Sequence, residues 1–243
     1  MMVQLIYGFI LAYFVLGGIG FYFINRNREA AIAKKSYTKF FVYFIIINIL
    51  FFSITVNSVI FKYVAYLIIG GGFAEMFALY RHSGFRHKSF FIFSLLVYFI
   101  LSAGLAIFSE KDRGLLLFVF LVISIFDSFS QITGQLWGRR KLAPSVSPNK
   151  TYGGLIGGIF VTVLSALLLQ GLYPFSGMKL TIVTLGTILF AFAGDLGASY
   201  YKRIFQVKDF SHLIPGHGGI LDRFDSLIAG GAWVGLCALV YGF

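Results

Sequence analysis

Residues 114–137, GLLLFVFLVISIFDSFSQITGQLW, decide the fold class of this chain. The run is almost entirely apolar and exceeds the about 20 residues that an α-helix needs to cross a membrane. In lipid the backbone has no water to bond, so such a run must satisfy its own polar groups as a helix. Its residues do not alternate between apolar and polar, as those of a membrane β-strand would.

Seven further runs have the same character. They are residues 3–24, 40–60, 63–80, 90–108, 153–171, 180–197 and 225–242. Only 12% of the residues are charged, about half of the roughly 25% typical of soluble domains. We therefore predict an all-α integral membrane protein of about eight spans, a single polytopic domain over residues 1–243. Residues 1–113 would form N-terminal helices and residues 114–243 the half that carries the polar motifs.

Basic residues gather in alternate connections between these runs. Four segments hold 16 of the 20 Lys and Arg residues: Arg26, Arg28, Lys34, Lys35 and Lys39; Arg81, Arg86 and Lys88; Arg139, Arg140, Lys141 and Lys150; and Lys202, Arg203, Lys208 and Arg223. The positive-inside rule puts these segments in the cytoplasm and both termini outside. The first run has positive charges after it and none before it, the reverse of a cleavable signal, so we expect it to be retained.

The excess of basic over acidic residues does not require a nucleic-acid partner. Segments placed at the membrane face attract anionic lipid headgroups, so we expect membrane lipids and no nucleic acid as partners. Cys237 is the one cysteine and lies in the last run, which excludes a disulfide framework and a thiolate metal site. Glycine motifs on the predicted helices are compatible with a homodimer.

Three acidic residues lie inside apolar runs, where charge is costly and marks function or a network of hydrogen bonds. Asp127 shares a helix face with Gln131 and Gln135, which indicates either a network between helices or the wall of a cavity for a polar ligand. Asp195 lies between glycines at the basic end of its run and is either a helix cap or part of a site. Glu75 follows a glycine run, and we interpret it as mainly structural.

The segment LAPSVSPNKTYGG, residues 142–154, is a second polar stretch. Ser147, Lys150 and Thr151 supply donors directly before the next predicted helix. A helix N-terminus preceded by donors is a natural site for anions. The alternative is an ordinary turn capped by Thr151.

The densest polar cluster is SHLIPGHGGILDRFDS, residues 211–226. Asp222 and Asp225 share a face on a helix, and carboxylates that act with substrate phosphates suit Mg²⁺. The glycines of residues 215–219 let the backbone approach a ligand closely. His217 is a candidate proton donor to a phosphate, whereas no pattern typical of zinc is present. Four basic residues can hold phosphates: Lys202, Arg203, Lys208 and Arg223. The cluster predicts a metal–phosphate site at the cytoplasmic face, with a solvated loop as the alternative.

These motifs have the order and spacing of a known family. Residues 199–225, SYYKRIFQVKDFSHLIPGHGGILDRFD, resemble the C-terminal signature of the phosphatidate cytidylyltransferases, also called CDP-diacylglycerol synthases. Asp127 and residues 142–151 are similar to the family's other polar region, and the resemblance extends over about residues 124–242. The chain departs from the family pattern at Ala198 and Gly153, where the family usually has acidic residues.

The resemblance implies that CMP is transferred from CTP to phosphatidate, or to a related lipid phosphate, with release of pyrophosphate. It implies Mg²⁺ as cofactor, with two divalent ions or one divalent and one monovalent ion as the alternatives. A phosphomonoester is already anionic near pH 7, so no strong protein base is required. The setting would be phospholipid biosynthesis at the cell (inner or plasma) membrane, with the active site facing the cytoplasm.

The same resemblance suggests roles for individual residues. Asp195 and Asp222, with Asp225 as a third acid, would be the metal ligands. Lys202, Arg203, Lys208 and Arg223 would hold phosphates, His217 would contact or protonate the leaving pyrophosphate, Asp127 would line the cavity, and Ser147, Lys150 and Thr151 would shape the nucleotide or lipid-phosphate side. Two rival functions stay open: a CTP-dependent lipid kinase that releases CDP, and a non-catalytic binder or transporter of an anion or lipid.

Overall fold

The computed structural model describes residues 2–27 and 29–242, and this part of the chain contains eight long α-helices. Their bounds are α1 Met2–Asn25, α2 Ala30–Val56, α3 Ser58–His82, α4 Lys88–Ser109, α5 Arg113–Trp137, α6 Tyr152–Leu169, α7 Gly177–Ile204 and α8 Leu221–Tyr241. All eight are long and apolar enough to cross a membrane. The prediction of an all-α polytopic membrane protein with eight spans is therefore confirmed.

The connection between α5 and α6 contains a small hairpin that the sequence pattern did not predict. Strand β1, Lys141–Ala143, pairs antiparallel with β2, Ser147–Thr151. At its end the Thr151 hydroxyl accepts the backbone N–H of Gly154 at 3.0 Å and caps α6. The capping by Thr151 that was the alternative interpretation of this segment is thus present, and the anion site stays a prediction.

The break between the second and third helices lies at Asn57, not at residues 61–62 as the apolar runs suggested. Asn57 has an extended backbone, and its side chain accepts the N–H of Val59 at 3.0 Å to start α3. Phe61 is buried inside α3. The predicted boundary was wrong because α2 and α3 are apolar on both sides of the turn, so a capping residue and not a change in hydropathy marks it.

Helices α2, α7 and α8 extend beyond their predicted spans into polar sequence. Helix α2 begins at Ala30 in a run of good helix formers, so Lys34 and Lys39 lie on a helix and not in a connection. Lys202 and Arg203 likewise lie in the last turn of α7, where positive charge complements the helix dipole. Arg28 is outside the described residues.

Helices α5 and α8 form the most buried part of the bundle, with α6 packed on α5 and with α4 and α7 packed on α8. Close approach between α4 and α8 depends on glycine. A Cβ on Gly104 would lie 2.8 Å from the Cα of Ala232, too close for any other residue. Helices α5 and α6 also approach closely at a glycine, since a Cβ on Gly154 would lie 2.6 Å from the carbonyl oxygen of Ser130.

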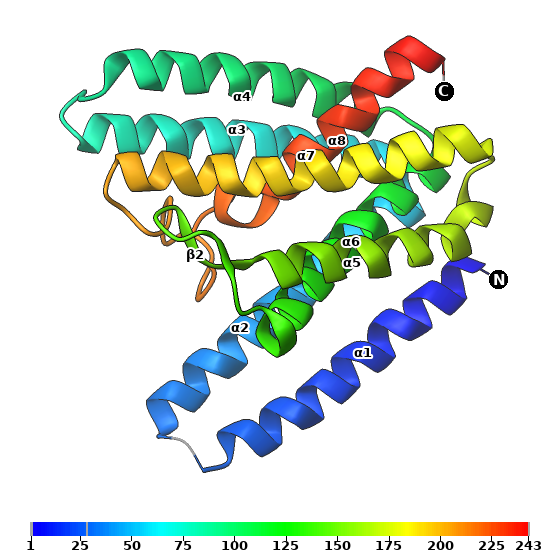
Figure 1. Cartoon of the computed structure of the whole chain (residues 1–243), viewed down its shortest axis with the longest axis horizontal. Helices are drawn as coiled ribbons and strands as arrows, with labels where there is room; N and C mark the ends of the chain where they lie inside the picture. The colour runs from blue at the N-terminus through cyan, green and yellow to red at the C-terminus, as the bar shows by residue number, and fades with distance from the viewer. Residues whose placement is uncertain (1, 28, 243) are drawn as a thin grey trace.

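The four connections predicted to be basic lie at the same end of the bundle. In Figure 1 the α1–α2 and α3–α4 connections, the hairpin and the α7–α8 connection are at the left, and both termini are at the right. This arrangement places the segment between α7 and α8 beside the hairpin, and it brings the two polar stretches of the sequence together.

Candidate active site

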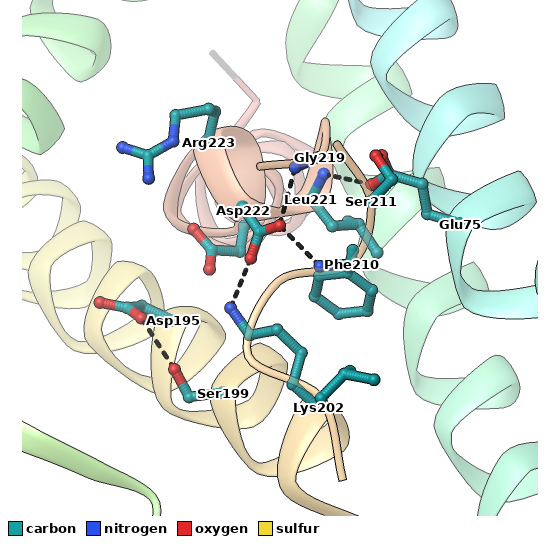
Figure 2. A network of polar contacts seen from close by, with 12 residues as sticks. Glu75, Asp195, Ser199, Lys202, Phe210, Ser211, Gly219, Leu221, Asp222 and Arg223 are labelled. Atoms are coloured by element: carbon teal, nitrogen blue, oxygen red, sulfur yellow. Dashed lines mark hydrogen bonds and ion pairs between the residues drawn. The ribbon is translucent and has the colours of Figure 1, made fainter. Parts of the chain in front are cut away.

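Asp222 is the centre of the polar cluster at the start of α8. Its Oδ1 accepts from the Lys202 ammonium at 2.5 Å, and its Oδ2 accepts the backbone N–H groups of Phe210 and Gly219 at 2.7 and 2.8 Å (Figure 2). The Asp222 side chain is 3% exposed and that of Lys202 is 10% exposed. One carboxylate therefore joins α7, the α7–α8 connection and α8.

These contacts leave Asp222 limited capacity for a further ligand. A carboxylate offers about four acceptor positions, two on each oxygen. The two backbone donors use both positions on Oδ2, and Lys202 uses one on Oδ1. One position on Oδ1 is left for a cation or a substrate group.

Glu75 of α3 caps the start of α8, although the two lie far apart in the sequence. It is buried, and its two oxygens accept from the Ser211 hydroxyl at 2.6 Å and from the N–H groups of Ile220 and Leu221 at 2.8 and 2.9 Å. These N–H groups belong to the first turn of α8, which has no side-chain cap of its own. The structural interpretation of Glu75 is thus correct. Figure 2 shows Glu75 and Arg223 on opposite sides of the start of α8.

Two adjacent glycines make room for these carboxylates. Gly218 has a φ of +87°, which favours glycine, and a Cβ there would lie 2.6 Å from Asp222 Oδ2. A Cβ on Gly219 would collide with the carboxylate of Glu75. The glycines of this segment thus allow close approach to acidic side chains of the protein itself.

Lys150 connects the hairpin to α7. Its ammonium lies 2.5 Å from Asp195 Oδ2 and 4.6 Å from the centre of the Phe192 ring. The other oxygen of Asp195 is 3.5 Å from the Ser199 hydroxyl. The structure thus brings Lys150 and Asp195, which are far apart in the sequence, into one ion pair. Asp195 is a partner of the hairpin and not a helix cap.

Three carboxylates from three helices lie within electrostatic range of one another near this pair. Asp225 of α8 is within electrostatic range of Asp195 and Asp127, and Asp127 of α5 is within range of Lys150 and interacts with the Ser226 side chain. Asp127, Gln131 and Gln135 are all exposed, so this face of α5 is open instead of packed on a neighbouring helix. That exposure favours the cavity-wall interpretation.

The chemistry of this acidic group suits a hard cation. Among the described residues, no three His, Cys, Asp or Glu side chains lie close enough together to form a complete metal cage. Mg²⁺ does not need one, because it is usually bound by one or two carboxylates, water and substrate phosphates. Asp195 and Asp225 repel each other, and a cation between them would relieve the repulsion. The residues present therefore fit the predicted ion.

His217 lies between α2 and α8. Its ring stacks on Tyr43 at an angle of 14° with the centroids 6.4 Å apart, and its backbone carbonyl accepts from Arg223 Nε at 3.0 Å. Its Nδ1 is buried and makes no hydrogen bond of regular geometry within the described part of the chain, although the backbone of Pro215 lies close to the ring. Burial lowers the pKa of His217, and the positive charges of Arg223 and Lys39 lower it further. The ring is therefore held neutral beside the site.

The remaining predicted residues surround this centre. Arg203 donates to the carbonyls of Val146 and Val207 at 3.2 and 2.8 Å and so holds the hairpin against the end of α7. Lys208 is exposed, Ser147 is half-buried at the start of β2, and Thr151 is buried as the cap of α6. The predicted residues thus come from α5, the hairpin, α7, the α7–α8 connection and the start of α8, and their roles stay predictions.

Two residues that contact the predicted site residues were not identified from the sequence. Tyr43 of α2 stacks on His217 and interacts with the Ser128 side chain beside Asp127. Phe192 lies under the Lys150 ammonium. Neither stands out in a chain with 30 Phe and 14 Tyr residues, so no local signal distinguished them.

The fold and the site define a class: polytopic membrane proteins that gather acidic and basic side chains in the half of a helix bundle that carries the hairpin. Comparison with known proteins narrows this class. The model of the cytidylyltransferase family matches residues 2–240, and the chain belongs to this family.

Three relatives of this chain carry the same name. The phosphatidate cytidylyltransferases of Rickettsia felis, Staphylococcus epidermidis and Staphylococcus aureus are 40%, 42% and 41% identical to this chain over 126 or 127 residues. Each match covers about half of this chain, and the chain spans about half the length of the relatives it matches: 56% of the first and 48% of each of the other two.

Proposed function

We propose that this chain transfers CMP from CTP to phosphatidate or a related lipid phosphate. An oxygen of the lipid phosphate attacks the α-phosphorus of CTP, a new P–O–P bond forms, and the bond to the β-phosphate breaks to release pyrophosphate. The observation that supports this most directly is the convergence of Asp127, Asp195 and Asp225 with Lys150 at the end of the bundle that carries the family signature.

The residues would share this work in a simple way. Lys150, Lys202, Lys208, Arg203 and Arg223 would offset the repulsion between two polyanions and hold their phosphates for in-line attack. His217, which is half-buried, would contact the leaving pyrophosphate. Asp127 would line the chamber, and Ser147 and Thr151 would shape its nucleotide side.

Mg²⁺ would be held by Asp195 and Asp225 together with water and substrate phosphates, because no three carboxylates of the described residues lie close enough together to bind it directly. When bound, it would neutralise the transferred and leaving phosphates. We further propose that the site end of the bundle faces the cytoplasm, because 16 of the 20 basic residues belong to segments at that end or beside it. CTP would then enter from the cytoplasm and the lipid from the membrane.

The test is pyrophosphate release by the purified protein in detergent with CTP, phosphatidate and Mg²⁺. Expected is release that depends on the lipid and that is lost in Asp225→Asn, while the melting temperature of this variant stays near that of the parent. CDP formed from CTP and a lipid alcohol would instead establish the kinase. Absence of turnover with every lipid phosphate, in protein that melts cooperatively, would favour a non-catalytic binder.

A further inference from the structure

An apolar groove lies along α1, outside the polar site. It has a volume of about 720 Å³, and its walls come from α1, α2, α5 and α6. In Figure 1 α1 runs along the lower edge of the molecule, with α5 and α6 above it. Most of the lining is aliphatic or aromatic, with Ile6, Ile10, Phe120 and Leu169 as examples, so the groove fits hydrocarbon and not a polar ligand.

One end of the groove is polar and adjoins the site. Tyr43 and Ser128 both line the groove, and they interact with each other. Asp127 is the residue before Ser128 and lies within electrostatic range of Tyr43. The groove is thus continuous with the open, acidic face of α5 through these two side chains.

The dimensions of the groove match a lipid chain. Along α1 its lining runs from Met2 to Leu16, a helical rise of about 21 Å at 1.5 Å per residue. One half of a bilayer's hydrocarbon core is about 15 Å thick. A single acyl chain therefore has room along the groove.

The depth of Asp127 explains why such a groove is needed. Asp127 lies ten residues before Trp137, so it is about 15 Å below the end of α5 that carries the hairpin. A phosphate that reaches Asp127 therefore lies within the span of α5 and not level with the hairpin. The chains attached to it must then extend toward the opposite end of the bundle, which is the direction in which the groove runs.

We propose that this groove binds an acyl chain of the lipid phosphate substrate and that Tyr43 and Ser128 mark the boundary between the chain and its headgroup. The inference rests on the proposed function and deepens it, because it assigns a surface to the apolar part of the substrate. The groove would then favour substrates with long chains, whereas the polar site would act on the phosphate alone.

The first experiment blocks the groove. Ala12 lines it, whereas Val15 lies on the same helix, is 62% exposed and does not line it. Ala12→Trp is expected to raise KM for a long-chain phosphatidate about tenfold, the loss expected when two methylene groups are no longer buried. Its KM for CTP and its turnover of dihexanoyl phosphatidate should equal those of Val15→Trp. An equal loss on short and long chains would overturn the proposal.

The second experiment does not require turnover. A phosphatidate with a diazirine at the end of one acyl chain is photolysed with the unmodified protein, and the labelled peptides are mapped. Expected is labelling of α1 and α5 residues of the groove that excess phosphatidate suppresses and excess phosphatidylcholine does not. Equal suppression by both lipids would show that the groove holds bulk lipid and would overturn the proposal.

The two experiments separate the inference from the function on which it rests. Selective labelling without any cytidylyl transfer would retain the groove as a lipid-phosphate site and reject the proposed enzyme. Transfer that is equally efficient in Ala12→Trp and Val15→Trp with long-chain substrate, without selective labelling, would retain the enzyme and reject the groove.

Discussion

The ammonium of Lys202 lies 2.5 Å from Oδ1 of Asp222, and both side chains are almost completely buried. A predicted phosphate-binding base and a predicted metal ligand are therefore each other's partner. Oδ2 of the same aspartate holds two backbone N–H groups of the α7–α8 connection. This ion pair fixes the signature segment onto α7 before any substrate is present.

Asp222→Asn is therefore expected to destabilise the protein as well as to inactivate it. The change leaves the buried charge of Lys202 without its partner, which typically costs about 3–5 kcal/mol. Thermal unfolding in detergent, followed by tryptophan fluorescence or light scattering, measures the loss. A melting temperature equal to that of the parent would contradict this prediction.

A double-mutant cycle separates the ion pair from the rest of the network. Lys202→Met removes the charge that Asp222→Asn leaves unpaired, so the double variant should lose less stability than the sum of the single losses. The two backbone donors to Oδ2 are present in every member of the cycle. Strictly additive losses would mean that Lys202 and Asp222 contribute independently.

Glu75→Gln is expected to loosen the start of α8. A glutamine offers one acceptor oxygen in place of two, so its amide NH₂ group faces either the N–H of Ile220 or the N–H of Leu221. Hydrogen bonds to a charged group contribute about 1.5–3 kcal/mol each, so the loss should be at least about 2 kcal/mol. Hydrogen exchange of the first turn of α8 should accelerate, while that of α4 should not.

Glu110→Gln is the matched control for Glu75→Gln. Glu110 pairs with Lys62 at 2.6 Å, but both side chains are exposed. Exposed pairs of this kind contribute little to stability. No measurable change in melting temperature is expected, and a loss as large as that of Glu75→Gln would mean that any lost carboxylate destabilises this protein.

Composition and charge were enough to predict that the chain has eight spans, that all of them are α-helices and that the basic connections are grouped together. These features are local, because each span needs only its own apolar length. The ion pair of Lys150 with Asp195 and the capping of α8 by Glu75 are not local. Glu75 is 145 residues from Ile220 along the chain, and no spacing rule connects two positions so far apart.

The hairpin of residues 141–151 was missed for a different reason. Its strands are three and five residues long, and Pro144 and Pro148 make the segment resemble an irregular loop. Arg203 stabilises it by donating to the carbonyl of Val146 in the turn. A contact from α7 thus supports a strand pair that its own residues only weakly favour.

The stability of the protein should fall as the pH is lowered through the ordinary range of histidine. The pKa of His217 is below its usual value in the folded state because the ring is buried near Arg223 and Lys39. The unfolded chain then binds a proton that the folded protein does not, so stability is complete above about pH 6.5 and declines below it. Melting temperatures between pH 8 and pH 5 measure this slope.

His217→Gln should flatten that slope. The variant cannot take up the proton, so the difference in melting temperature between pH 8 and pH 5 should be smaller than in the parent. His212→Gln is the control, because His212 is exposed in the same connection and has the same charge when protonated. An unchanged slope in His217→Gln would mean that another group controls the pH dependence.

Lys150 and Asp195 should shift the requirement for Mg²⁺ in opposite directions. The Lys150 ammonium occupies Oδ2 of Asp195 at 2.5 Å, so it competes with a cation for the same carboxylate. Lys150→Met should lower the Mg²⁺ concentration that gives half-maximal pyrophosphate release, and Asp195→Asn should raise it. Each shift should be about tenfold, since a unit charge a few ångströms away contributes about 1–4 kcal/mol.

The measurement is a Mg²⁺ titration at saturating CTP, with Arg139→Met as a control that removes an equal charge from an exposed position near the hairpin. Lys150→Met should at the same time lower kcat/KM for CTP if Lys150 binds phosphate as proposed. Shifts in the same direction for both variants would mean that Lys150 binds substrate but does not compete for Asp195, and that the cation lies elsewhere.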